Sequence, residues 1–254
     1  MLLISMLIIT YFSIGASSVQ INYIKVPPSV RNNTNRPVIL DCNYSVRPDD
    51  TDLVVKWLLN DEVVYQWIPP KLPQSLGVLK DRIDLSYAAT NNPNTVHRAI
   101  KINNPITSIE GEYKCFVSTF ADEDFSAKVM IIFEPEKSLD MYENKPSRSK
   151  INFTCMASKV YPKPKLSLYR DKKNDVINKN PLEAIEWDTV RHQEDGRFSS
   201  FIVATANLDD LDPGDLINCE LRIPMTGYVK RKSLIYYPLE MTTRNCVLSF
   251  KMNL

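Results

Sequence analysis

The chain has 254 residues, of which 44% are hydrophobic, and it carries 31 Lys and Arg against 30 Asp and Glu. A chain of this length forms about two domains of ordinary size, each with its own core. The balanced charge, without a long run of one sign, argues against nucleic acid or a membrane surface as a partner selected by bulk charge. Six glycines and 17 prolines argue against a collagen-like or glycine-rich sequence.

The first 18 residues predict a secretory signal peptide. An uncharged apolar run from Leu2 to about Ile14 is followed by the small residues Gly15 to Ser18. A run this short with a small-residue end is typical of a cleaved signal, and a membrane anchor is the alternative. Cleavage would leave a mature chain that begins near residue 19.

Because the chain is expected to be exported to an oxidising compartment, disulfide bonds are a better interpretation of the five cysteines than a metal site. None has CxxC spacing and the chain has two histidines, so we expect no metal and no other cofactor. Pairing Cys42 with Cys115 and Cys155 with Cys219 would give each half of the chain one long bridge. Cys246 then remains, and it either links a dimer or stays free in a tail.

Alternating side chains predict short strands around the first two cysteines. In VILDCNY, Val38, Leu40 and Cys42 share one face while Ile39 and Asn43 share the other. Turn sequences such as NNPN and ADED separate most of the strands, and the spacing indicates a β-sandwich. The strands expected in this half are 38–44, 53–60, 62–68, 82–88, 96–102, 112–119 and 127–133.

The order Cys42, Trp57, Cys115 resembles the immunoglobulin fold, in which a Trp packs on the disulfide between two sheets. Tyr113, in EGEYKC, occupies the tyrosine-corner position two residues before the second Cys. The stretch between Trp57 and Arg82 leaves room for the extra strands of a variable-type domain.

One position departs from that pattern. Variable-type domains usually carry an Asp that pairs with an Arg at the place of Arg82. Ile109 stands at the Asp position here, and the nearest acid is Glu110. The ion pair is therefore in doubt.

The second half resembles a constant-type immunoglobulin domain. CMASKVYPKPKLSLY matches its strand B to strand C region, including a Tyr161–Pro162 turn whose peptide bond is often cis in that family. Tyr169 stands where the pattern places Trp, and Ile217 replaces the corner Tyr. The resemblance implies an all-β chain of two immunoglobulin-like β-sandwich domains in tandem: a signal peptide at 1–18, a variable-type domain at 19–134, a constant-type domain at 135–240 and a tail at 241–254.

Catalysis finds little support in the sequence. A serine nucleophile needs a base that accepts its proton, and His97 and His192 lie in different predicted domains. We therefore expect no enzyme activity.

Three N-x-S/T acceptors predict glycosylation at Asn32, Asn43 and Asn152. Strand alternation turns Asn43 and Asn152 outward, because their neighbours Cys42 and Cys155 point inward. Sugars there would block one sheet of each domain from protein contact.

The opposite sheet of the first domain presents apolar side chains. With Cys115 inward, Leu58 and Phe116 point outward, and Phe120 continues that strand. The next strand adds either Tyr65 and Trp67 or Val64 and Ile68, depending on register. The expected partner-binding residues are Leu58, Tyr65, Trp67, Phe116 and Phe120. The alternative is that the second domain or segment 68–77 covers this face.

Three stretches, NYIKVPPSV, VILDCNY and VKWLLNDEVVYQWIP, resemble insect proteins of the beaten path type, which are similar to adhesion and axon-guidance ligands. Costimulatory ligands share this architecture. The resemblance implies a secreted or surface-associated glycoprotein that binds another immunoglobulin-type cell-surface protein. Homophilic and heterophilic binding both stay open, and contact with a membrane is only indirect.

A second function remains open from the sequence. A soluble immune or scavenging factor would bind microbial or small ligands, and it needs a concave pocket or a basic groove. The sequence shows neither feature.

Overall fold

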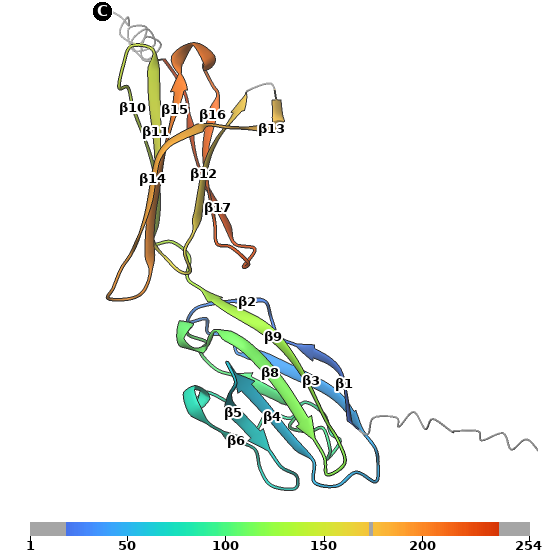
Figure 1. Cartoon of the computed structure of the whole chain (residues 1–254). Helices are drawn as coiled ribbons and strands as arrows, with labels where there is room; N and C mark the ends of the chain where they lie inside the picture. Colours follow the sequence, from blue (N-terminus) through green and yellow to red (C-terminus); the bar gives the residue numbers. More distant parts are fainter. Residues whose placement is uncertain (1–18, 173–174, 239–254) are drawn as a thin grey trace, which may run out of the picture. The chain divides into compact units, whose positions relative to one another are not determined.

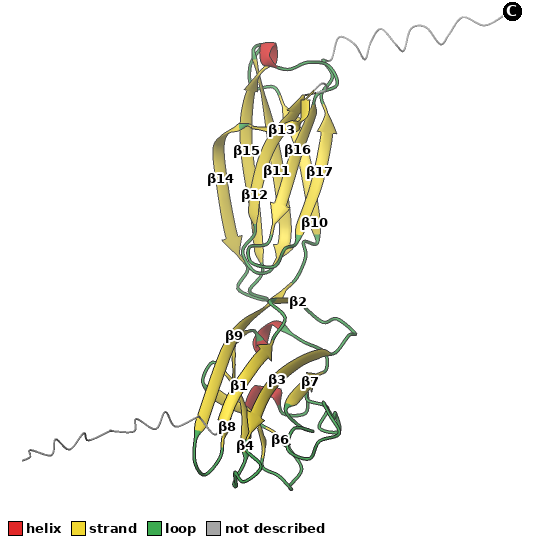
Figure 2. Ribbon diagram, turned by 90° about the vertical axis from the view of Figure 1, so that its right-hand side faces the viewer, coloured by secondary structure: helices red, strands yellow, loops and turns green. Residues whose placement is uncertain are grey.

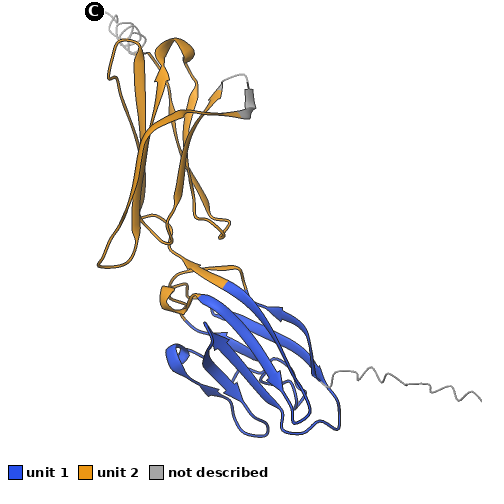
Figure 3. Cartoon of the chain, viewed as in Figure 1, with its two compact units in different colours: residues 1–26, 37–103, 111–129 blue, residues 27–36, 104–110, 130–254 orange. Residues whose placement is uncertain are grey.

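The computed structural model describes residues 19–172 and 175–238, and the fold is all-β. The expected signal at 1–18 and the tail with Cys246 lie outside the described residues. The chain divides into two compact units, shown in Figure 3. The described part of the first unit is 19–26, 37–103 and 111–129, and the second holds 27–36, 104–110, 130–172 and 175–238. The domain boundary near residue 134 stays a prediction.

Two sheets form the first sandwich, one of three strands and one of six (Figure 1). In the larger sheet, the short strand at residues 29–31 runs parallel to the strand at 123–133. Two further strands, at 62–67 and 74–75, extend the opposite edge of this sheet, as in variable-type domains. The smaller sheet has the order β1 (Val19–Lys25), β3 (Val38–Val46), β7 (Ala99–Ile102), and the larger has β2 (Ser29–Arg31), β9 (Glu123–Phe133), β8 (Gly111–Ser118), β4 (Val54–Leu59), β5 (Glu62–Trp67), β6 (Gln74–Ser75). The 3-10 helices η1 (Gly77–Leu79) and η2 (Thr107–Ile109) lie in the connections.

The expected bridge and its aromatic neighbours form the centre of this sandwich. Cys42 and Cys115 are disulfide-bonded, with 6.3 Å between their Cα atoms. Trp57 lies opposite Cys115 in the strand register and is fully buried, and its indole N–H donates to the Arg98 carbonyl at 3.2 Å. Tyr113 is also fully buried. These residues therefore hold the scaffold and are not available for binding.

The strand predicted at 82–88 is wrong. Only Ile83 forms a β-bridge there, to Ile102, and Leu85 and Ser86 form a turn. Asp84 accepts hydrogen bonds from the Ser86 backbone N–H at 3.1 Å and from the Ser86 hydroxyl at 2.6 Å. This side-chain-to-backbone turn competes with the extended backbone, which the apolar alternation alone did not reveal.

Glu110, the acid beside Ile109, does not pair with Arg82 as the Asp of the family pattern would. Ile109 is fully buried, and Glu110 accepts the backbone N–H of Ile132 at 3.3 Å. Among the described residues, Arg82 forms no ion pair with Glu110.

The second sandwich consists of two four-stranded sheets, which Figure 2 shows as yellow strands. The Tyr161–Pro162 peptide bond is cis, as the resemblance implies. Cys155 and Cys219 form the second expected disulfide, with 6.1 Å between their Cα atoms. One sheet has the order β10 (Ser138–Asn144), β11 (Lys150–Val160), β15 (Phe198–Asn207), β14 (Glu183–Arg191), and the other has β13 (Asp175–Pro181), β12 (Lys165–Lys172), β16 (Leu216–Arg222), β17 (Val229–Ile235); η3 (Leu208–Asp210) follows β15.

The residue that faces the second disulfide is Leu168 and not Tyr169. Leu168 lies opposite Cys219 and belongs to the core with Ile217. Tyr169 lies opposite Asn218, on the outer face of the sheet, where the Lys179 ammonium sits 4.6 Å from its ring centroid. Because side chains alternate along a strand, only one of the adjacent residues Leu168 and Tyr169 can face the core, and it is Leu168.

A buried carboxylate organises the outer face of the same sheet. Glu220 is only 3% exposed and pairs with Lys179 at 3.0 Å, Arg222 at 2.6 Å and Arg231 at 2.6 Å. Burial by itself raises the pKa of Glu220, but the hydrogen bonds from Arg231, Lys179 and Arg222 outweigh it and lower that pKa to about 2. Glu220 therefore stays charged at any physiological pH.

This network predicts an acid-dependent loss of stability. A carboxyl whose folded pKa lies below its unfolded value stabilises the fold above the unfolded pKa, and it loses that contribution as pH falls toward about 2. The free energy of unfolding should therefore fall less steeply in Glu220→Gln than in wild type between about pH 5 and pH 2. Urea denaturation at a series of pH values measures this slope. The control is Glu183→Gln on exposed β14, and equal slopes in wild type and Glu220→Gln would contradict the prediction.

Candidate functional site

The exposed face of the six-stranded sheet carries aromatic rings beside lysines. Lys56 lies directly opposite Phe116 on the neighbouring strand, and Leu58 lies opposite Lys114. Each of these four alternates with a buried residue, so all four point away from the core. We call this surface the aromatic–lysine face: Lys56, Leu58, Lys114, Phe116 and Phe125.

Phe125 was missed by the sequence reasoning. It lies on β9, which begins at Glu123, whereas the predicted strand began at residue 127. Phe125 is 62% exposed. The only sequence signal was an aromatic residue directly after the acidic turn ADED.

Cation–π contacts hold the lysines over the rings. The ammonium of Lys56 lies 5.9 Å from the Phe116 ring centroid, and that of Lys114 lies 5.7 Å from the Phe125 centroid. Lys114 also pairs with Asp61 at 2.5 Å, and the hydrogen bond that Lys114 donates to Asp61 raises the pKa of Lys114. The face thus combines apolar rings with the Lys56 ammonium and the Lys114–Asp61 ion pair.

Phe120 occupies a loop and not the strand. β8 ends at Ser118, and the Phe120 side chain is 85% exposed in the turn before β9. Its backbone N–H donates to the Thr51 carbonyl at 3.0 Å. Phe120 therefore lies at the end of the sheet, beside the β3–β4 connection, where variable domains carry their binding loops.

Tyr65 and Trp67 do not lie on the exposed face, which corrects the prediction. Both are 2% exposed, because they lie opposite the core residues Trp57 and Val55. A β-bulge between Trp57 and Leu58 places Val64 as the extra residue, and it is buried as well.

Hydrogen bonds satisfy the polar atoms of these two aromatic side chains. The Tyr65 hydroxyl donates to the His97 carbonyl at 2.9 Å, and the Trp67 indole N–H donates to the Lys71 carbonyl at 3.1 Å. The Trp67 ring also meets the His97 imidazole edge to face, with 5.4 Å between centroids. Burial raises the pKa of the Tyr65 hydroxyl, so it remains a donor at physiological pH.

Segment 68–72 faces a loop of the same unit. Residues 69–72 line a mainly apolar pocket of about 450 Å³ together with Trp67, Pro93, Asn94, Val96 and His97. The Leu72 side chain in this segment is 80% exposed. The segment thus lies beside the loop before β7, as a neighbour of His97.

Stability measurements separate the buried from the exposed aromatic residues. Trp67→Ala should lower the free energy of unfolding by about 3–5 kcal/mol, because it empties a packed site. Phe120→Ala should change it by less than about 0.5 kcal/mol, because the ring is exposed. Chemical denaturation followed by circular dichroism measures both variants. A large loss in Phe120→Ala would place that ring in the core.

The glycan acceptors Asn43 and Asn152 lie on β3 and β11, in the sheets opposite to those that contain β8 and β16. Both side chains are partly exposed. The Asn43 side-chain oxygen accepts from Asn22 at 2.7 Å. The Asn32 amide donates to Glu134 within the second unit. Glycosylation at all three stays a prediction.

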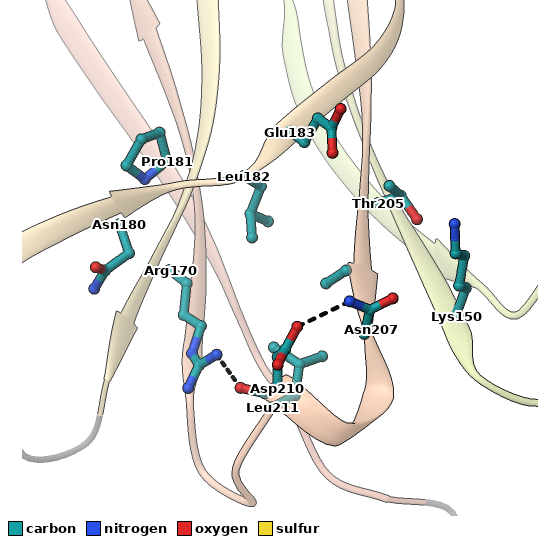
Figure 4. A pocket seen from close by; sticks show the side chains of 11 residues that line it. Lys150, Arg170, Asn180, Pro181, Leu182, Glu183, Thr205, Asn207, Asp210 and Leu211 are labelled. Atoms are coloured by element: carbon teal, nitrogen blue, oxygen red, sulfur yellow. Dashed lines mark hydrogen bonds between the residues drawn. The ribbon is translucent and has the colours of Figure 1, made fainter.

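A polar pocket of about 510 Å³ lies in the second sandwich (Figure 4). Arg170 lines it, and the Arg170 guanidinium donates to the Asp210 carbonyl and pairs with Asp215 at 2.7 Å. Asp215 is fully buried and Arg170 is 7% exposed. The charge of the arginine is therefore committed to the fold rather than offered to a ligand.

Removing one member of this pair should be strongly destabilising. Arg170→Met leaves Asp215 buried without a counter-ion, which costs about 3–5 kcal/mol of unfolding free energy. The double variant Arg170→Met with Asp215→Leu should recover most of that loss, because no charge remains buried. Thermal and urea unfolding of the single and double variants test this coupling. A double variant as unstable as the single one would show that the pair is not the cause.

The two histidines take part in separate local contacts. The His192 Nε2 atom lies 2.8 Å from the Ser199 hydroxyl across the β14–β15 hairpin, and the His97 Nδ1 atom lies 3.3 Å from the Tyr87 carbonyl. Within the described residues, no group of three His, Cys, Asp or Glu side chains is placed to hold a metal ion.

Comparisons with known proteins agree with the fold. Over 84% of this chain and 96% of the other, the structure is similar to that of bovine butyrophilin, with a TM-score of 0.61 and 12% identity. It is also similar to Rst D1-D2, with a TM-score of 0.51 and 12% identity over 86% of this chain and 98% of the other. No protein-family model and no curated protein matches the sequence. The chain therefore has the tandem immunoglobulin-like fold, and identities this low establish nothing beyond it.

No helix among residues 19–172 and 175–238 has the length and apolar character that crossing a membrane requires.

Proposed function

We propose that this chain is a secreted or surface-associated recognition protein that binds another cell-surface protein through the aromatic–lysine face. The observation that carries the proposal is the exposure of Phe125 and the outward position of Phe116 on one open sheet. Exposed rings on a sheet of a small sandwich are unfavourable in water unless a partner covers them. Aromatic residues are also the side chains that contribute most to protein interfaces.

The lysines give this face a preference among partners. Lys56 and Lys114 each sit above a ring, so a partner that covers the rings also meets the Lys56 ammonium and the Lys114–Asp61 ion pair. Phe120 extends the apolar surface toward the loop end of the sheet. A partner with an apolar centre and an acidic group that faces Lys56 fits this pattern best.

The class of partner, the export of the chain, its glycosylation and its possible dimerisation belong to the same proposal. The resemblance to beaten path proteins supports a heterophilic immunoglobulin-type partner in adhesion or guidance, and the signal segment supports export. A glycan on Asn43 would leave the aromatic–lysine face open, since Asn43 lies on the other sheet of the same sandwich. Cys246 lies outside the described residues, and a dimer linked through it belongs to the proposal as well.

Phe116→Glu tests the proposed face. The charge should weaken binding at least about a hundredfold, because it adds a desolvated carboxylate at the centre of an apolar contact. The measurement is binding of the multimerised chain to a library of extracellular domains and, in parallel, to microbial surfaces.

The matched control is Ile39→Glu, which places the same charge on the partly exposed outer side of β3, in the opposite sheet. Thermal unfolding of both variants verifies that they fold. If Phe116→Glu keeps full binding while Ile39→Glu loses it, the binding face has been assigned to the wrong sheet. Binding to microbial surfaces alone would favour the scavenging function.

A further inference from the structure

One sheet of the second sandwich gathers cations that are far apart in the sequence. Each of its four strands contributes one to the outer face. We call this surface the basic face: Lys179 on β13, Lys165 on β12, Arg222 on β16 and Arg231 on β17.

The strand register places these side chains on the same side. Cys219 and Leu221 point into the core. Glu220, which lies between them, and Arg222, which follows Leu221, therefore point outward. Lys165 lies directly opposite Arg222, and Arg231 lies directly opposite Glu220. The Lys179 ammonium reaches the same carboxylate at 3.0 Å.

The described side chains leave this face with positive charge in excess. Its four cations meet two carboxylates, Glu220 and Asp171, so two positive charges are not neutralised. Glu220 is 3% exposed, whereas the side chains of Arg222 and Arg231 are 54% and 53% exposed. Solvent therefore meets the cations, and the anion lies beneath them.

Glu220 also fixes the positions of these cations before any ligand arrives. Arg222 contacts it through Nε and Nη2, and Arg231 contacts it through Nε. The guanidinium groups keep further N–H donors that these contacts do not use. Side chains that are already ordered lose less conformational entropy when they bind.

The chemistry of the face favours an anionic polymer over a protein. Tyr169, the one aromatic residue of these four strands, is buried. Protein interfaces centre on exposed aromatic anchors, which this face does not offer. Arginine and lysine bind sulfate groups through charge-assisted hydrogen bonds, and three interstrand spacings spread the cations over about 14 Å. From these observations we propose that the basic face binds a linear sulfated polysaccharide, at a site separate from the aromatic–lysine face.

The test measures binding of the full chain to immobilised heparin by surface plasmon resonance at about 0.15 M salt. Wild type should bind, and the affinity should fall as salt rises, because the contacts are electrostatic. Lys165→Glu should weaken binding about tenfold through the reversed charge. Lys165 is exposed and has no ion pair among the described residues, so this variant should unfold at the wild-type temperature.

The matched control is Lys150→Glu, which makes the same charge change on β11 of the other sheet and should alter binding less than about twofold. Absence of binding by wild type, or equal losses in the two variants, overturns the proposal. Chemically desulfated heparin should fail to compete, which supports sulfate recognition. If polyglutamate competes as well as heparin does, the proposal is overturned in favour of an acidic protein.

Discussion

The inward direction of the two disulfides is the constraint on which both sandwiches depend. Cys115 on β8 and Cys219 on β16 point into their cores, so every second side chain on those strands faces the other way. Burial of the bridges, with Trp57 on the first and Leu168 on the second, fixes the direction of each strand. The exposed chemistry of both sheets follows from that direction. Phe116 is outward because Cys115 is inward, and Arg222 is outward because Leu221 is inward.

The two outward faces then differ because their strands differ in composition. In the first sandwich, rings and lysines alternate with core residues, and cation–π contacts join them. In the second sandwich, the outward positions hold a buried glutamate and its cations, so the exposed charge of that face is positive. One fold thus presents two surfaces of unlike chemistry. A surface with exposed rings fits a protein, and a surface with surplus charge and no exposed ring fits an anionic polymer.

Local alternation predicted most of the first sandwich but not its irregular parts. The outward positions of Leu58 and Phe116 follow from period-two patterns in single strands, and the disulfide pairs follow from the resemblance to immunoglobulin domains. Tyr65 and Trp67 were misplaced because the β4–β5 register contains a bulge, and a bulge depends on contacts between strands. The strand expected at 82–88 failed for a local reason, the turn that Asp84 and Ser86 form.

The sequence by itself determined the all-β class, the tandem arrangement, the cysteine pairs and the absence of any bulk charge that would select a partner. The all-β class depends on short-range periodicity, whereas the tandem arrangement and the cysteine pairs follow from the resemblance to immunoglobulin domains. Only the tertiary structure decided which aromatic rings are buried, where Phe125 lies and that Lys165, Lys179, Arg222 and Arg231 share a face. The physical reason is that strand pairing brings together residues that are distant in the chain. The positions of these residues in the sequence do not reveal the strand register that joins them.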